Sequence, residues 1–225
     1  MQLLPHYTHI VNPKLKHTYL SFDDEGTLVI RSPKVSRNYI ERLLLKKSAW
    51  INRSREKLLQ KKGKRLQFRG EEKLYFLGQP YALDLVPRDK AGTTLAFDNR
   101  QQFRLYYRQY DTARFQAHVD RFYRKEAEAF IPPLVEKYAQ QMALSPSGIR
   151  FRKTKRQWGS CSGKDILSFN TMLMKLPSEA IEYVIVHELA HIRHKHHQKA
   201  FWELVGKHIP DYQRKIAILK SYTTY

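Results

Sequence analysis

The chain has 225 residues, a length that suits one compact catalytic domain with an appended smaller lobe. It contains no run of eighteen apolar residues, and its start lacks a basic segment followed by an apolar one. We therefore expect neither a membrane-spanning helix nor a secretory signal. One cysteine, Cys161, excludes an internal disulfide, so we expect a cytoplasmic protein, or a nuclear one in a eukaryote.

Charge is the unusual property of this composition. Lys and Arg number 41 against 21 Asp and Glu, which gives a net charge of +20. The stretch from Arg31 to Gly70 holds fourteen Lys and Arg against two acids, Glu41 and Glu56, a local balance of +12. Such a stretch is either a solvated basic face or a surface that attracts nucleic acid, acidic protein or anionic membrane.

The first half of the chain has strand patterns around one long helix. Two alternating runs, His17–Phe22 and Thr27–Arg31, flank the turn residues Asp23–Gly26 and predict a β-hairpin. Ser36 is a suitable N-cap for a helix that continues to about Leu59. Further strands are predicted within 66–86 and 94–107, with a turn at Gly78-Gln79-Pro80 and a loop at Pro87–Gly92.

The second half is mainly helical. A helix is predicted over Thr112–Met142, and the pair Pro132-Pro133 should kink or split it. After a break at Ser145–Gly148, strands are predicted over Ile149–Lys155 and Ile166–Met172. A helix then opens at Pro177-Ser178 and runs to about His194, and a last helix starts near Lys199, with Pro210 as a breaking point. These elements predict an α+β fold with an N-terminal β-rich basic lobe, 1–108, and a C-terminal α+β domain, 109–225.

The strongest chemical signal is the run His187-Glu188-Leu189-Ala190-His191. On a helix, two histidines four residues apart lie on one face, close enough to share a metal ion. Glu188 would lie beside the open coordination position and could take a proton from water on zinc. Because the surrounding 180–192 segment is otherwise strongly apolar, these polar groups need partners, and a metal meets that need.

A third protein ligand is needed to leave one coordination position open. The candidates are His194, His196, His197, His208 and Glu203. On a continued helix His197 would point about 240° away from His191, so it can ligate only if the helix ends first. No Gly or Pro supplies that end, but His194 stands where it is needed, and His tolerates the left-handed region better than most residues. With His194 as the third ligand, all three ligands would lie in a line along one helix, which suits a tetrahedral site poorly. Geometry therefore favours His197 slightly.

Several further segments resemble the YgjP-like metallopeptidases, relatives of the SprT-like and WLM zinc proteases. The resemblance covers most of the chain and is carried by TLVIRSP (27–33), KKSAWI (46–51), FLGQPYAL (76–83), WGSCS (158–162), Leu176-Pro177 and VIVHELAHIRHKHHQKAFW (184–202). The chain departs from the family pattern at one point, since Gln157 separates Arg156 from Trp158.

The resemblance implies a gluzincin-like fold in which the metal helix packs against a small sheet. It also implies Zn²⁺ as cofactor, His187, His191 and His197 as ligands, Glu188 as the catalytic residue, and a peptide or protein as substrate. Nickel or cobalt would satisfy the same ligands. Since SprT-like and WLM relatives act on proteins bound to DNA, the basic lobe suggests a protease recruited to such proteins.

Two other functions compete with a zinc peptidase. One is a nucleic-acid-associated basic protein whose metal site is structural, and the other is hydrolysis of a small-molecule amide. For the remaining residues we expect Cys161 to pack or shape a loop, and Phe201 and Trp202 to anchor the His197 segment. Tyr183, one turn before His187, is expected in the core or facing the site. The sequence indicates no oligomeric state.

Overall fold

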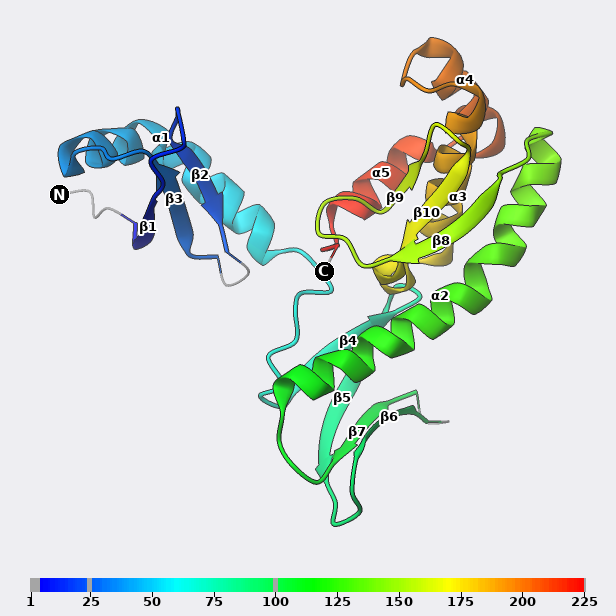
Figure 1. The fold of residues 1–225 in the computed structure, drawn as a ribbon, viewed down its shortest axis with the longest axis horizontal. Helices are drawn as coiled ribbons and strands as arrows, with labels where there is room; N and C mark the ends of the chain where they lie inside the picture. The colour runs from blue at the N-terminus through cyan, green and yellow to red at the C-terminus, as the bar shows by residue number, and fades with distance from the viewer. Residues whose placement is uncertain (1–4, 24–25, 99–100, 225) are drawn as a thin grey trace. The chain divides into compact units, whose positions relative to one another are not determined.

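The computed structural model describes residues 5–23, 26–98 and 101–224 and has the predicted α+β class. The chain forms two compact units, Met1–Lys61 and Lys62–Tyr225 (Figure 1). This division lies well before the boundary predicted near 108. Within the described ranges, no helix combines the length and the apolar character needed to cross a bilayer.

The first unit is a three-stranded sheet with one helix. The predicted hairpin is confirmed, since β2 (Tyr19–Phe22) and β3 (Leu28–Ser32) pair in antiparallel fashion. Of its predicted turn, Asp24 and Glu25 lie outside the described residues. The sequence pattern missed a third strand, β1 (Tyr7–Val11), which pairs parallel to β3 and makes β3 the central strand.

Helix α1 (Arg37–Leu59) begins and ends as predicted. The backbone N–H of Tyr39 donates to the Ser36 hydroxyl over 3.2 Å, which satisfies one of the free donors at the helix start. The helix buries a narrow apolar stripe against β3, and the core of the unit consists of Leu28, Ile30, Ile40, Leu44 and Ile51. This small core leaves most of α1 exposed.

The second unit begins with a four-stranded sheet of order β4-β5-β7-β6. Its strands are β4 (Glu72–Phe76), β5 (Gln79–Pro87), β6 (Thr93–Phe97) and β7 (Phe103–Tyr107). Helix α2 (Thr112–Met142) packs on this sheet, as the edge-on contact of Phe122 with Phe103 at 5.0 Å illustrates. Sheet and helix share one hydrophobic core, which is why no division between compact units falls near residue 108.

Helix α2 is continuous through Pro132 and Pro133, so of the predicted kink or split, the split does not occur. A proline inside a helix removes a backbone hydrogen bond and destabilises the helix. Ile131 and Val135, on either side of the pair, are 0% and 2% exposed. We infer that burial of this helix face offsets the loss, because side-chain packing supplies most helix stability in proteins.

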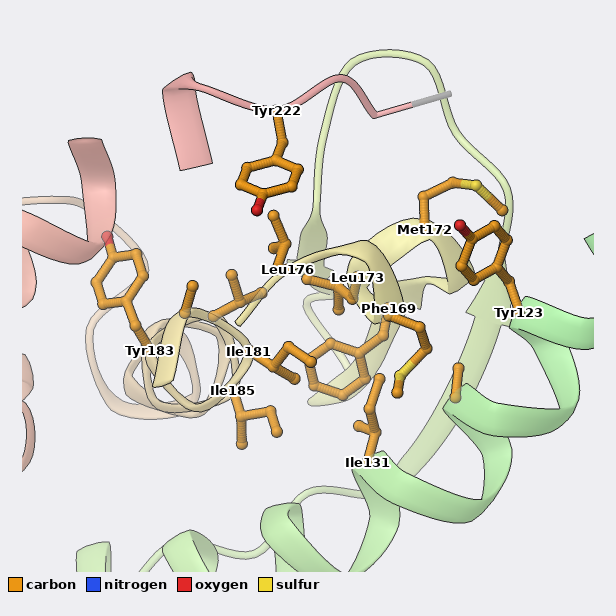
Figure 2. Packing of buried hydrophobic residues seen from close by; sticks show 14 of the residues in the cluster. Tyr123, Ile131, Phe169, Met172, Leu173, Leu176, Ile181, Tyr183, Ile185 and Tyr222 are labelled. Carbon is orange, nitrogen blue, oxygen red and sulfur yellow. The ribbon is translucent and has the colours of Figure 1, made fainter. Parts of the chain in front are cut away.

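A second sheet of order β8-β10-β9 lies beside the C-terminal helices. Phe169 of β10 is fully buried and lies between Ile131 of α2 and Ile181 of the next helix, α3 (Figure 2). Strand β9 was not predicted. The elements are β8 (Gly148–Arg152), β9 (Gly159–Cys161), β10 (Ile166–Asn170), the 3₁₀ helix η1 (Thr171–Lys175), α3 (Ser178–Arg193), α4 (Lys199–His208) and α5 (Tyr212–Lys220).

Gly78 joins the first sheet of this unit to the segment between η1 and α3. It forms the β4–β5 turn at φ +85°, and a Cβ there would lie 2.8 Å from the Pro177 ring. Its N–H donates to the Lys175 carbonyl over 3.2 Å, so the turn abuts the start of α3. A glycine is needed here both for the positive φ and for the close approach.

Candidate metal centre

Helix α3 carries the motif histidines and Glu188 in an apolar setting. Nine of its sixteen residues are buried, among them Glu188, which is 5% exposed. His187 and His191 are partly buried, and their rings lie 5.0 Å apart. The helical period therefore brings both imidazoles to one face, as predicted.

The helix ends where the sequence requires it to end. Arg193 is its last residue, and His194 is extended, with φ −123° and ψ 99°. The left-handed conformation that we expected at His194 is therefore wrong, although the break itself is confirmed. Because the chain leaves the helix there, His197 returns to the face that carries His187 and His191 instead of continuing around the helix axis.

The three histidines His187, His191 and His197 form a compact donor set. One nitrogen of each lies within 4.8 Å of the corresponding nitrogens of the other two, and the Nε2 atoms of His187 and His197 are 3.0 Å apart. Two nitrogens bound to a tetrahedral zinc are roughly 3.3 Å apart, given Zn–N bonds of about 2.0–2.1 Å. The spacing therefore fits one divalent metal ion.

The other ligand candidates have different roles in the structure. Glu203 is exposed, with its Oε1 3.7 Å from the Nζ of Lys199. His194 contributes its backbone carbonyl, which accepts from Nδ1 of His191 over 3.0 Å. Within 5–23, 26–98 and 101–224, the donor set that could hold a metal contains neither these two residues nor His196 or His208.

Hydrogen bonds outside the donor set orient two of the imidazoles. A carbonyl only accepts, so Nδ1 of His191 carries the proton and its Nε2 keeps a free electron pair. The hydroxyl oxygen of Tyr183 lies 3.2 Å from Nδ1 of His187 and can accept in the same way. Such partners fix the tautomer and ring orientation that a metal ligand needs.

Burial keeps His187 and His191 neutral. Desolvation, followed by the neighbouring His191 and His197, lowers the pKa of His187 to about 3. The pKa of His191 is lowered as well, chiefly by burial. Metals bind neutral imidazole, so proton competition at both sites is weak near neutral pH.

Aromatic rings support the histidines from α4. Phe201 is fully buried, and its ring centroid lies 4.7–4.9 Å from those of His187, His191 and His197. The Trp202 ring stacks on His197 at 5.6 Å. The anchoring role predicted for this aromatic pair is confirmed, since both rings contact the His197 imidazole directly.

An ion pair also ties the turn before His197 to the second sheet. Nζ of Lys195 lies 2.6 Å from Oδ1 of Asp165, which stands just before β10. The pair is partly exposed, so its contribution to stability is small, about 0–1 kcal/mol. It nevertheless connects the short segment that positions His197 to the rest of the unit.

Strand β9 runs against the catalytic candidate Glu188. A Cβ on Gly159 would lie 2.7 Å from both Cγ and Oε1 of Glu188, closer than any side chain permits. Burial raises the pKa of Glu188 to about 8. A cation held by the three imidazoles would oppose this shift, because a nearby positive charge favours the ionised carboxylate.

Cys161 and Tyr183, the two other residues considered from the sequence, both pack against the core. Cys161, at the end of β9, is half-buried against the core, and burial raises the pKa of its thiol. This supports the packing role. Tyr183 is buried with its hydroxyl at His187, so it belongs to both the core and the site.

The sequence matches one known family over most of its length. The pattern of the family described as "YgjP-like, metallopeptidase domain" matches residues 16–222. This chain belongs to the YgjP-like metallopeptidase family. Membership in this family implies a divalent metal and a peptide or protein substrate, and the histidine cluster supplies a suitable donor set.

Two solved structures are similar over part of the chain. The metallopeptidase zymogen of Pyrococcus abyssi abylysin is 24% identical, with 37% of this chain and 89% of that chain covered and a TM-score of 0.34. For the zymogen of Methanocaldococcus jannaschii jannalysin, the identity is 22%, the coverage 38% and 91%, and the TM-score 0.34. No curated protein matches the chain.

Proposed function

We propose that this chain is a zinc-dependent metallopeptidase, with His187, His191 and His197 as the ligands and Glu188 as the general base. The observation that carries the proposal is the cluster of three imidazole nitrogens within 4.8 Å beside a buried carboxylate. Three protein ligands leave the fourth tetrahedral position open for water or substrate, as catalytic zinc sites require.

Zinc, when bound, would act as a Lewis acid on the peptide carbonyl and lower the pKa of a water molecule. Glu188 would take the proton of that water and pass it to the leaving amine. Its position suits this task, because Glu188 directly follows the ligand His187 on α3 and is buried away from bulk water.

Strand β9 supplies a means of holding the peptide. It lies at one edge of the β8-β10-β9 sheet, and Gly159 on it lies against Glu188. An extended peptide can pair with such an edge through backbone hydrogen bonds. We expect a substrate added to β9 in this way to present its scissile bond near the base.

The replacement of Glu188 by Gln tests the mechanism. The amide cannot accept the proton, so peptide hydrolysis should fall about 100- to 10 000-fold, the range that general-base catalysis supplies. Zinc content should stay at the level of the parent protein, since Glu188 is not a ligand. Cleavage of a quenched fluorescent casein and elemental analysis of the purified protein measure the two quantities.

Glu203→Gln is the matched control, because it removes an exposed carboxylate from the neighbouring helix. It should leave both hydrolysis and zinc content unchanged. If the Glu188→Gln variant cleaved casein as fast as the parent, Glu188 would not be the base and the mechanism would be wrong.

A further inference from the structure

Helix α1 has one row of residues with an unusual composition. Tyr39, Arg42, Lys46, Trp50, Arg53 and Lys57 follow one another at spacings of three, four, four, three and four. Residues three and four apart lie on the same helix face, so these six side chains form a single row about 27 Å long. We call this set the α1 row. It contains four cations, two aromatic residues and no acid.

The α1 row faces solvent in the structure of its unit. A different face of the helix packs on β3 through Ile40, Leu44 and Ile51. Every member of the row is exposed, and the two aromatic side chains, Tyr39 and Trp50, are 46% and 41% exposed. Trp50 also contacts Phe22 at a centroid distance of 6.3 Å, which steadies its ring without covering it.

The four cations of the row have no acidic partner among the described residues. The ion pair on α1 joins Arg37 to Glu41, neither of which belongs to the row. The other acid of the helix, Glu56, lies beside the row and forms no ion pair within the described ranges. Like charges four residues apart, such as Arg42 and Lys46, disfavour a helix, so the row costs stability until a polyanion neutralises it.

We propose that the α1 row binds single-stranded nucleic acid. Cations in a line match the regularly spaced phosphates of one strand, and exposed aromatic rings between them offer stacking faces for unpaired bases. The local charge balance of +12 over residues 31–70 attracts such a strand over a longer range. This surface belongs to the first unit, and its binding does not depend on the metal centre.

The same observations argue against the other polyanions. The apolar face of α1 is committed to its own core, so the helix cannot lay that face into a bilayer. An acidic protein or a DNA duplex could use the four cations but would leave Tyr39 and Trp50 without stacking partners, because duplex bases are already stacked. A single strand is the occupant that uses both components of the row.

Two charge-matched triple variants of the full-length chain test the proposal. Row variant Arg42→Gln, Lys46→Gln, Arg53→Gln and control variant Lys34→Gln, Lys47→Gln, Arg55→Gln each remove three exposed cations from the same unit. Fluorescence anisotropy of a labelled 20-nucleotide oligo-dT measures binding at several salt concentrations. Circular dichroism melting checks that both variants fold.

The row variant should bind the oligonucleotide at least about tenfold more weakly. Its slope of log K against log salt should become shallower by about two, since each lost phosphate contact on a single strand contributes about 0.7. The control should change affinity less than threefold. Equal weakening by both triples would mean diffuse attraction by net charge and would overturn the proposal.

The aromatic component has its own test. Trp50→Leu should weaken oligo-dT binding about fivefold or more with the salt slope unchanged, and Trp50→Phe should restore most of the affinity. A hairpin duplex should bind more weakly than oligo-dT. Tighter duplex binding, or row-dependent sedimentation with phosphatidylserine vesicles in the absence of oligo-dT binding, would assign the row to a different partner and contradict the proposal.

Discussion

Helices α1 and α3 place their polar residues in opposite settings. α1 buries three of its twenty-three residues, whereas α3 buries nine of its sixteen. On α1, a cation is stable with water alone, so any single Lys or Arg says little about function. In the largely buried middle of α3, a polar group loses water and needs a partner, so His187, Glu188 and His191 indicate a site at once.

A sequence pattern therefore has chemical meaning for different reasons on a buried helix and on an exposed one. Three polar residues in a buried helix predict a metal site by their type and spacing. On the exposed helix, the meaning comes only from the arrangement, when cations and aromatic rings share one row without an acid. The two regions should therefore respond differently to substitution and to metal removal.

The largest difference between the α3 metal site and the α1 row is expected on substitution of His197. His197→Ala removes one of three ligands, so zinc should be lost from the purified protein, while His196→Ala, its exposed neighbour, should retain it. Elemental analysis measures zinc, and oligo-dT anisotropy should be unchanged in both variants. Zinc loss in His194→Ala but not in His197→Ala would overturn the ligand assignment.

A smaller effect is expected at Gly159. In Gly159→Ala the new methyl group would lie within 2.7 Å of Glu188, so the carboxylate must move. We expect hydrolysis of casein to fall by roughly 100-fold, because misplaced catalytic groups lose about this much rate. The zinc content should be retained.

Gly163→Ala is the control for this change, since a Cβ there meets no atom within 4 Å. Its activity should match that of the parent. Full activity in Gly159→Ala would show that Glu188 does not need its present position against β9.

The smallest effect is expected at Tyr183. Tyr183→Phe keeps the buried ring but removes the hydroxyl 3.2 Å from Nδ1 of His187. Zinc affinity should fall about tenfold, the lower end of the effect of losing such an orienting partner. Competition with a chromogenic chelator measures the affinity, and the visible spectrum of the cobalt form should shift.

Tyr212→Phe, which keeps the ring stacked on Trp202 at 5.1 Å, should leave both readouts unchanged. Unchanged affinity in Tyr183→Phe would place this tyrosine in the core without a role at His187.

Much of the fold could be predicted because its signals are local. The Ser36 cap, the hairpin of β2 and β3, and the helical spacing of His187 and His191 each depend on residues within a few positions of one another. Strand β9 was missed because its three residues are too few to show an alternating pattern. Strand β1 was missed because it is stabilised by parallel pairing with β3, which follows β2 in the chain.

The residue pattern alone was enough to predict the class of the fold, the helix that carries the motif, and the need for this helix to end before His197. How the helix ends became clear from the three-dimensional arrangement, in which His194 is extended and its carbonyl accepts a hydrogen bond from His191. The same arrangement brings Gly159 against Glu188 and places the Phe201 ring in contact with all three imidazoles. The two kinds of feature differ because helical spacing depends on residues that are neighbours along the chain. A close approach between distant segments exists only once the core has packed.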